Sequence, residues 1–164
     1  MDKQVKHGFK PVIDNQCQIL ILGSMPSVQS RAGSFYYLHP QNRFWRVLTA
    51  LFNLDFVSAG ILQKQDLLLK LHIALYDVID SCQITGSADS SIKNVKPINL
   101  EALLKLAPIK QIYLNGSKAY TLFKKHFPAR QSMAMPLLST SAASARYSLV
   151  DLINQWSCIK KNLN

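Results

Sequence analysis

Residues 17–23 read CQILILG, a short apolar run that ends in glycine. A strand buried on both faces has such a continuous run, whereas a half-exposed strand alternates apolar and polar residues. Further apolar runs occur at 73–79, 109–115 and 133–138, and we expect each of them to be a strand. The apolar spacing and the caps Ser58 and Asn99 predict helices over 42–54, 58–71, 99–107, 117–127 and 145–159.

This alternation of strands and helices indicates an α/β fold with a parallel sheet and helices on both of its faces. Ligands of such sheets bind in the crevice beyond the carboxyl ends of the strands. The loops at that edge follow Leu22, Ile79, Leu114 and Leu138. We therefore expect the ligand-binding crevice in these four loops.

Composition favours a single folded domain over residues 1–164. Hydrophobic residues make up 48% of the chain and charged residues 17%, which excludes disorder for most of it. The longest apolar stretch is far too short to cross a bilayer, and the polar first ten residues lack the apolar region of a signal peptide. We expect a soluble, cytoplasmic protein that does not bind a membrane.

The charge balance points to an anionic partner. The chain carries 19 Lys and Arg against 9 Asp and Glu, a formal charge of +10. This excess favours nucleic acid, bound by a broad basic face, although solubility alone is an alternative reason for it. The three cysteines are far apart and form no CxxC pair, so we expect inert thiols and no bound metal.

Two segments after the first strand concentrate unusual residues. Residues 23–27 read GSMPS, in which glycine and proline suit a turn beneath a ligand, and an ordinary turn fits them equally well. Residues 36–45 read YYLHPQNRFW. Their flat side chains offer stacking surface for a base, while Asn42 and Arg43 offer directional hydrogen bonds. Phe44 and Trp45 also fit the core at the start of a helix, which we prefer for Trp45.

Five segments occur in unbroken order within residues 17–160: ILILGSMPS, YYLHPQNRFWRVL, IALYDVIDSCQITGSADSSI, IYLNGSKAYTLF and LLSTSAASARYSL. They resemble the uracil-DNA glycosylase superfamily, and within it the hypoxanthine (deoxyinosine) DNA glycosylases. The resemblance implies a three-layer α/β/α sandwich with a central four-stranded parallel sheet. It also implies a monofunctional DNA glycosylase, which flips a damaged base out of the duplex and hydrolyses its N-glycosidic bond. We expect no cofactor, no metal, and a monomer whose partner is DNA containing a damaged base.

The resemblance assigns roles to individual residues. Asn42 matches the catalytic asparagine of the deoxyinosine branch and is expected to orient the attacking water, with His39 a second candidate that assists the leaving group. Met25 stands where many relatives carry Asp or Asn, and it cannot position water. Asp77 lies near the base-reading position, where it either accepts the N1–H of hypoxanthine or anchors a loop. The expected base pocket comprises Gly23, Ser24, Met25, Pro26, Tyr36, Tyr37, Asp77 and Asn115.

The final loop departs from the family pattern. Residues 138–144 read LSTSAAS, where relatives tend to read PSTSPAN, so two prolines and an asparagine are replaced. Gln83 likewise stands where relatives often have arginine, and Asp89 is expected to brace its own loop. Hydroxyls and N–H groups of the final loop can still bind phosphates. The expected DNA-binding residues are Ser27, Arg43, Ser139, Thr140, Ser141, Ser144 and Arg146.

Two other functions stay open beside deoxyinosine excision. One is excision of uracil by the same fold. The other is a DNA-binding protein that has lost the chemistry, which the altered final loop suggests. Asn42 and the aromatic cluster favour an enzyme. A small-molecule α/β enzyme would explain neither the charge nor the lack of a catalytic Ser/His/Asp or metal set.

Overall fold

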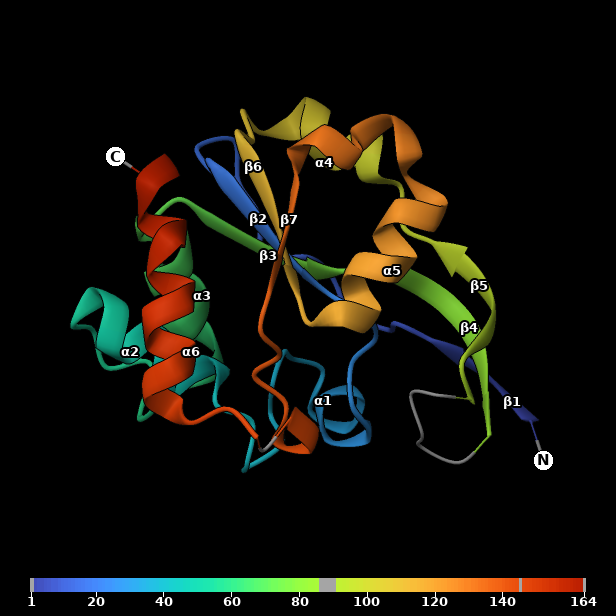
Figure 1. Cartoon of the computed structure of the whole chain (residues 1–164), viewed down its shortest axis with the longest axis horizontal. Helices are drawn as coiled ribbons and strands as arrows, with labels where there is room; N and C mark the ends of the chain where they lie inside the picture. Colours follow the sequence, from blue (N-terminus) through green and yellow to red (C-terminus); the bar gives the residue numbers. More distant parts are fainter. Residues whose placement is uncertain (1, 86–90, 145, 164) are drawn as a thin grey trace.

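The centre of the fold is a four-stranded parallel sheet in the order β3-β2-β6-β7 (Figure 1). The computed structural model describes residues 2–85, 91–144 and 146–163. All four strands lie within the apolar runs that the sequence singles out. Their bounds are β2 (Ile19–Gly23), β3 (Ile73–Asp77), β6 (Gln111–Asn115) and β7 (Ala134–Leu137).

Side chains of the sheet alternate between two hydrophobic cores, one on each face. Ile19 and Ile21 of β2 belong to one core, and Leu20 and Leu22 belong to the other; all four are fully buried. Helices α2, α3 and α6 cover the first face, and α4 and α5 cover the second (Figure 1). The structure therefore confirms the three-layer α/β/α fold. The bounds are α2 (Phe44–Phe52), α3 (Ile61–Lys70), α4 (Leu100–Leu106), α5 (Ser117–His126) and α6 (Leu149–Trp156).

Helix starts follow local hydrogen bonding. Asn99 caps α4 as predicted, because its side chain accepts the Ala102 N–H at 3.2 Å. Ser58 is not the cap of α3: its N–H donates to Asp55, and Gly60 is the cap residue instead. Helix α6 starts after Ser148 rather than at 145, and a short helix α1 (Val28–Gly33) was not predicted. Segments of 3₁₀ helix also span Pro128–Met133, Ala142–Ser144 and Ser157–Asn162.

A second, antiparallel sheet of three strands in the order β1-β4-β5 flanks the first. Its strands are β1 (Asp2–Lys6), β4 (Ile79–Thr85) and β5 (Lys93–Pro97). The strand predicted over 73–79 is thus wrong at its end, because β3 stops at Asp77 and Ile79 opens β4. Strands β1 and β5 are largely exposed and polar, so a search for apolar runs does not find them. No helix of the described residues is long and apolar enough to span a membrane.

The carboxyl ends of the parallel strands bring four chain segments together. Gly23 pairs with Asp77 across β2 and β3, and Asn115 pairs with Leu137 across β6 and β7. The Val78 N–H also donates to the Gly23 carbonyl at 2.8 Å, which fixes the turn after Asp77 against the first loop. This edge of the sheet is where the sequence places the ligand crevice.

Candidate active site

A cavity of about 820 Å³ opens at this edge of the sheet. Its wall combines the first loop, the segment before α2, the ends of β3 and β6, and the final loop. Every residue predicted for the base pocket lines it, and so do both catalytic candidates, His39 and Asn42. The sequence did not single out Gln29, Ser117 or Lys118, which line it as well. The crevice rule for parallel sheets thus located the cavity.

Asn42 is held by a hydrogen-bond network that reaches three segments of the chain. Its Oδ1 accepts the Phe44 N–H and the Thr140 hydroxyl, each at 2.9 Å. Thr140 Oγ1 in turn accepts from Asn115 Nδ2 at 3.0 Å, and the Thr140 N–H donates to Asn115 Oδ1 at 3.0 Å. The amides of Asn42 and Asn115 are therefore joined through one hydroxyl.

This network decides which end of the Asn42 amide meets a ligand. A carbonyl oxygen has two lone pairs, and both of those on Oδ1 have a donor. A flipped amide would place two N–H donors face to face at Phe44, so the orientation is fixed. Nδ2 has no hydrogen bond within the described residues, and Asn42 lines the cavity. Any water that Asn42 positions in this arrangement is held by its Nδ2 hydrogens.

The two predicted stacking tyrosines differ in their surroundings. Tyr36 is only 2% exposed; its hydroxyl donates to the Lys10 carbonyl at 2.7 Å and its ring packs edge-on against Phe9. Tyr37 is half-buried and stacks on Phe44 with ring centroids 4.1 Å apart. Burial and then the charge of Asp77 raise the pKa of the Tyr37 hydroxyl, which therefore stays a proton donor. Tyr36 is mainly a core residue, and Tyr37 is the better candidate for contact with a base.

Asp77 forms the floor of the cavity and is 3% exposed. Its Oδ2 lies 2.7 Å from Nε2 of His7, a buried residue that follows β1. Gly23 is in close contact with the other carboxylate oxygen, because a Cβ at this position would lie 2.4 Å from Oδ1. His7 is not predicted from the sequence, because it lies far from Asp77 along the chain and follows a polar strand. Its residue type alone, histidine, is only a weak indication of a role in the site.

His39 has a defined tautomer when it is neutral. The Gln41 N–H donates to its Nδ1 at 3.1 Å, so Nδ1 is an acceptor and Nε2 carries the proton. The ring lines the cavity and is half-buried. The geometry thus gives His39 one hydrogen-bond donor, at Nε2, for a ligand.

Hydrogen bonds within the chain bear on two of the predicted DNA contacts, Thr140 in the final loop and Arg43 before α2. Thr140 is fully buried, and both its hydroxyl and its N–H already donate within the network, so it cannot donate to phosphate. The Arg43 guanidinium bonds the carbonyl oxygens of Ser141, Ser144 and Tyr147. These bonds brace the final loop, and contact of Arg43 with a phosphate stays a prediction.

The other residues predicted to contact phosphate differ in the hydrogen bonds that their side chains already make. Ser27 caps α1, and Ser139 Oγ accepts the Ser141 N–H at 3.1 Å. Ser141 Oγ in turn accepts from the Ala143 N–H at 3.2 Å. Arg146 is exposed and lies over the ring of Tyr147. These roles stay predictions.

Three further residues that the sequence analysis singles out are Met25, Gln83 and Asp89. Met25 lines the cavity with a side chain that has no acid or base function. Gln83 is on β4, where its Oε1 accepts from Asn94 at 2.6 Å. Asp89 lies outside the described residues.

The described residues contain no group of three or more His, Cys, Asp or Glu side chains that could hold a metal. Burial raises the pKa of the Cys17 thiol to about 11, as expected for an inert cysteine.

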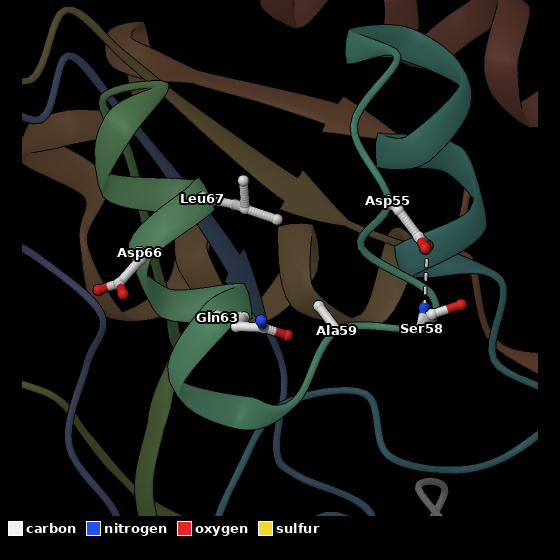
Figure 2. A pocket seen from close by; sticks show the side chains of 6 residues that line it. All are labelled: Asp55, Ser58, Ala59, Gln63, Asp66 and Leu67. Atoms are coloured by element: carbon white, nitrogen blue, oxygen red, sulfur yellow. Dashed lines mark hydrogen bonds between the residues drawn. The ribbon is translucent and has the colours of Figure 1, made fainter.

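A second hollow, of about 420 Å³, lies where the loop after α2 meets α3. Figure 2 shows its six lining residues, with the Asp55 carboxylate accepting the Ser58 N–H at 2.9 Å. It shares no lining residue with the large cavity. Asp55 and Asp66 give it two carboxylates, which would repel phosphate. The hollow is therefore a poor site for DNA.

Known proteins resemble this chain over most of its length. The family profile of the Uracil DNA glycosylase superfamily matches residues 11–160. A curated protein of Methanosarcina barkeri, named hypoxanthine DNA glycosylase, is 36% identical over 146 residues, which cover 86% of this chain and 89% of the relative. A protein of the same name from Methanosarcina acetivorans is 32% identical over 148 residues, or 88% of this chain and 91% of the relative.

A solved structure has the same fold. It is the solution NMR structure of a candidate uracil DNA glycosylase from Methanosarcina acetivorans, with a TM-score of 0.81 and 30% sequence identity. The match covers 97% of this chain and 96% of that chain. Sequence profile, relatives and fold agree along almost the whole length. The chain therefore belongs to the uracil DNA glycosylase superfamily and is a DNA glycosylase.

Proposed function

We propose that the substrate is deoxyinosine in DNA and that the enzyme hydrolyses the bond between hypoxanthine and its sugar. The observation that carries this proposal is the buried Asp77 carboxylate on the floor of the cavity. Deamination of adenine replaces the N1 acceptor with an N1–H donor, and a carboxylate accepts from that donor but repels the adenine lone pair. Two relatives named hypoxanthine DNA glycosylase support the same substrate.

The rest of the cavity offers complementary groups for a flipped purine. The second Nδ2 hydrogen of Asn115 and the Tyr37 hydroxyl are donors suited to the O6 carbonyl. The buried Tyr37 hydroxyl makes no hydrogen bond of good geometry within the described residues, although buried polar groups normally have one. The Asn115 side chain is close enough to lower the pKa of that hydroxyl slightly, against the larger effect of burial. A substrate carbonyl would supply an acceptor for the Tyr37 proton.

The reaction follows from the arrangement around Asn42. The bond between the sugar C1′ and N9 of the base breaks, and its electron pair leaves with hypoxanthine. A water held by Asn42 Nδ2 adds to C1′ as the sugar becomes cationic, and it releases a proton to solvent. An amide is no base, so its contribution is position rather than deprotonation. His39 carries its proton on Nε2 and lines the cavity, which supports its role as a hydrogen-bond donor to the departing base.

Binding to the duplex relies on the positive charge of the chain. The exposed side chains of Lys118, at the cavity, and Arg146, in the final loop, provide cations close to the entrance. Lysine and arginine bind phosphates by releasing condensed counterions. The final loop, braced by Arg43, presents its remaining N–H groups to the backbone of the DNA. These contacts position the duplex, while Asp77 selects the base.

Uracil is the second candidate substrate, because its N3–H, like the N1–H of hypoxanthine, is a single donor next to a carbonyl group. The family profile and the solved relative both carry uracil in their names. The test is incubation with labelled duplexes that contain inosine, uracil or xanthine, followed by alkali to cleave abasic sites. We expect strand breaks at inosine above all. Breaks at uracil alone would contradict the deoxyinosine proposal, and breaks with none of the duplexes would contradict excision of any of these bases.

A further inference from the structure

The second sheet positions His7 beside Asp77, the carboxylate that we propose reads the base. His7 follows β1, and its N–H continues the ladder by donating to the Asp80 carbonyl at 2.8 Å. Its ring is 2% exposed and packs between Phe9 and Tyr76, at centroid distances of 4.4 and 4.7 Å. The sheet and these rings therefore fix the position of the imidazole.

The two carboxylate oxygens of Asp77 have different surroundings, because only Oδ2 is bonded to His7. Nε2 of His7 is 2.7 Å from Oδ2, and His7 is not among the residues that line the cavity. Oδ1 packs over Gly23, which does line the cavity. Oδ2 faces His7, on the side away from the cavity lining, so Oδ1 is the oxygen that the carboxylate offers to a base. The floor of the cavity thus has one free acceptor instead of two.

The number of acceptors matters for the choice between purines. Guanine carries two adjacent donors, N1–H and the 2-amino group, and a carboxylate with two free oxygens can accept from both. Hypoxanthine has the same N1–H and O6 but no amino group. A single free oxygen accepts the N1–H of hypoxanthine, the one donor on that edge, and leaves the guanine amino group without a partner. Sites with unpaired buried polar groups discriminate strongly between otherwise similar ligands.

We propose that His7 is a specificity-determining residue: by occupying Oδ2 of Asp77, it lets the pocket accept hypoxanthine and reject guanine. This inference rests on the proposed function and extends it to a residue outside the cavity. His7 does not touch the base, so it acts as a positioning residue through Asp77. Rejection of guanine is essential for such an enzyme, because guanine is a normal base with the same N1–H and O6.

Two carboxamide variants test the inference. His7→Gln can place an amide nitrogen where Nε2 lies, whereas the shorter His7→Asn reaches only the Nδ1 position and leaves Oδ2 free. The assay is single-turnover excision from duplexes with an I·T or a G·T pair, which differ only by the 2-amino group. Circular dichroism confirms folding, and the absolute excision rate from the I·T duplex reports on general damage to the site.

We expect the wild-type enzyme to excise from I·T at least about tenfold faster than from G·T. In His7→Asn the ratio of the two rates should fall about tenfold, and His7→Gln should restore it. A ratio that stays constant in His7→Asn while all rates fall would show that His7 only supports the fold. The same ratio shift in both variants would also overturn the inference, because a donor at Oδ2 would then not matter.

The outcomes separate this inference from the proposed function. If the wild-type enzyme leaves inosine intact, the proposed function fails, and the inference fails with it. If the wild-type enzyme excises inosine and guanine equally well, only the inference fails. The second comparison needs no variant, so equal excision of the two bases refutes the inference even if His7→Asn does not fold.

Discussion

Thr140 is the hydroxyl on which the arrangement of the two amides depends. Thr140→Val keeps the shape of the side chain and removes Oγ1. Asn42 Oδ1 then loses one of its two donors, and Asn115 Nδ2 loses its acceptor. Thr140→Ser is the matched control, because it keeps the hydroxyl and loses only a methyl group.

The size of the effect follows from the burial of the network. Thr140 is 0% exposed, so water cannot simply take the place of its hydroxyl. A buried polar group without a partner costs about 1–3 kcal/mol. Asn42 and Asn115 are only half-buried, so their freed atoms can partly rehydrate, and we expect a total loss of about 2 kcal/mol in the free energy of unfolding. The loosened Asn42 amide should lower the excision rate by about 10- to 100-fold.

Single-turnover excision on an inosine duplex measures the rate, and urea denaturation measures the free energy of unfolding. Thr140→Ser should stay close to wild type in both. A folded Thr140→Val enzyme that excises at the wild-type rate would refute the idea that Thr140 sets the working orientation of Asn42.

Three other predictions follow from the site. Tyr37→Ala should lose about 1–3 kcal/mol of base-stacking energy and slow excision. Tyr36→Phe should lower Tm, because its hydrogen bond to Lys10 is lost, and leave the excision rate unchanged. The reverse result would make Tyr36 the residue that contacts the base and Tyr37 the core residue. Arg43→Lys cannot reach three carbonyls at once, so faster hydrogen exchange over 139–147 is expected, and unchanged exchange would contradict the bracing role. DNA affinity should fall with salt with a logarithmic slope steeper than about −2.5, measured by fluorescence anisotropy, and a flat response would show that the basic surface does not face DNA.

Elements with a continuous apolar pattern could be predicted from the sequence. Residues 17–23 contain β2 because both faces of a central parallel strand are buried, and the crevice rule then located the cavity. Strands β1 and β5 were missed because an exposed edge sheet needs no apolar run. The break after Asp77 was missed because Val78 and Ile79, which follow it, are apolar and buried like the strand before it.

Site residues could be predicted as types but not as partners. The family resemblance assigned Asn42, Asp77 and Asn115 to the site, and all three line the cavity. The sequence could not tell that Thr140 faces inward, because a serine- and threonine-rich loop has no pattern that separates buried hydroxyls from exposed ones. It also could not pair His7 with Asp77, since 70 residues separate them and only the second sheet brings them together.

The role of Asn42 is the centre of the proposed mechanism, and single-turnover excision on an inosine duplex tests it most directly. Asn42→Ala should lose about 10²- to 10³-fold in rate and still bind the duplex, because the phosphate contacts lie elsewhere. Asn42→Asp should retain more activity than Asn42→Ala, since a carboxylate oxygen in the place of Nδ2 can also hold water and stabilises a cationic sugar. If folded Asn42→Ala excises hypoxanthine at the wild-type rate, another group holds the water and the proposed mechanism is wrong.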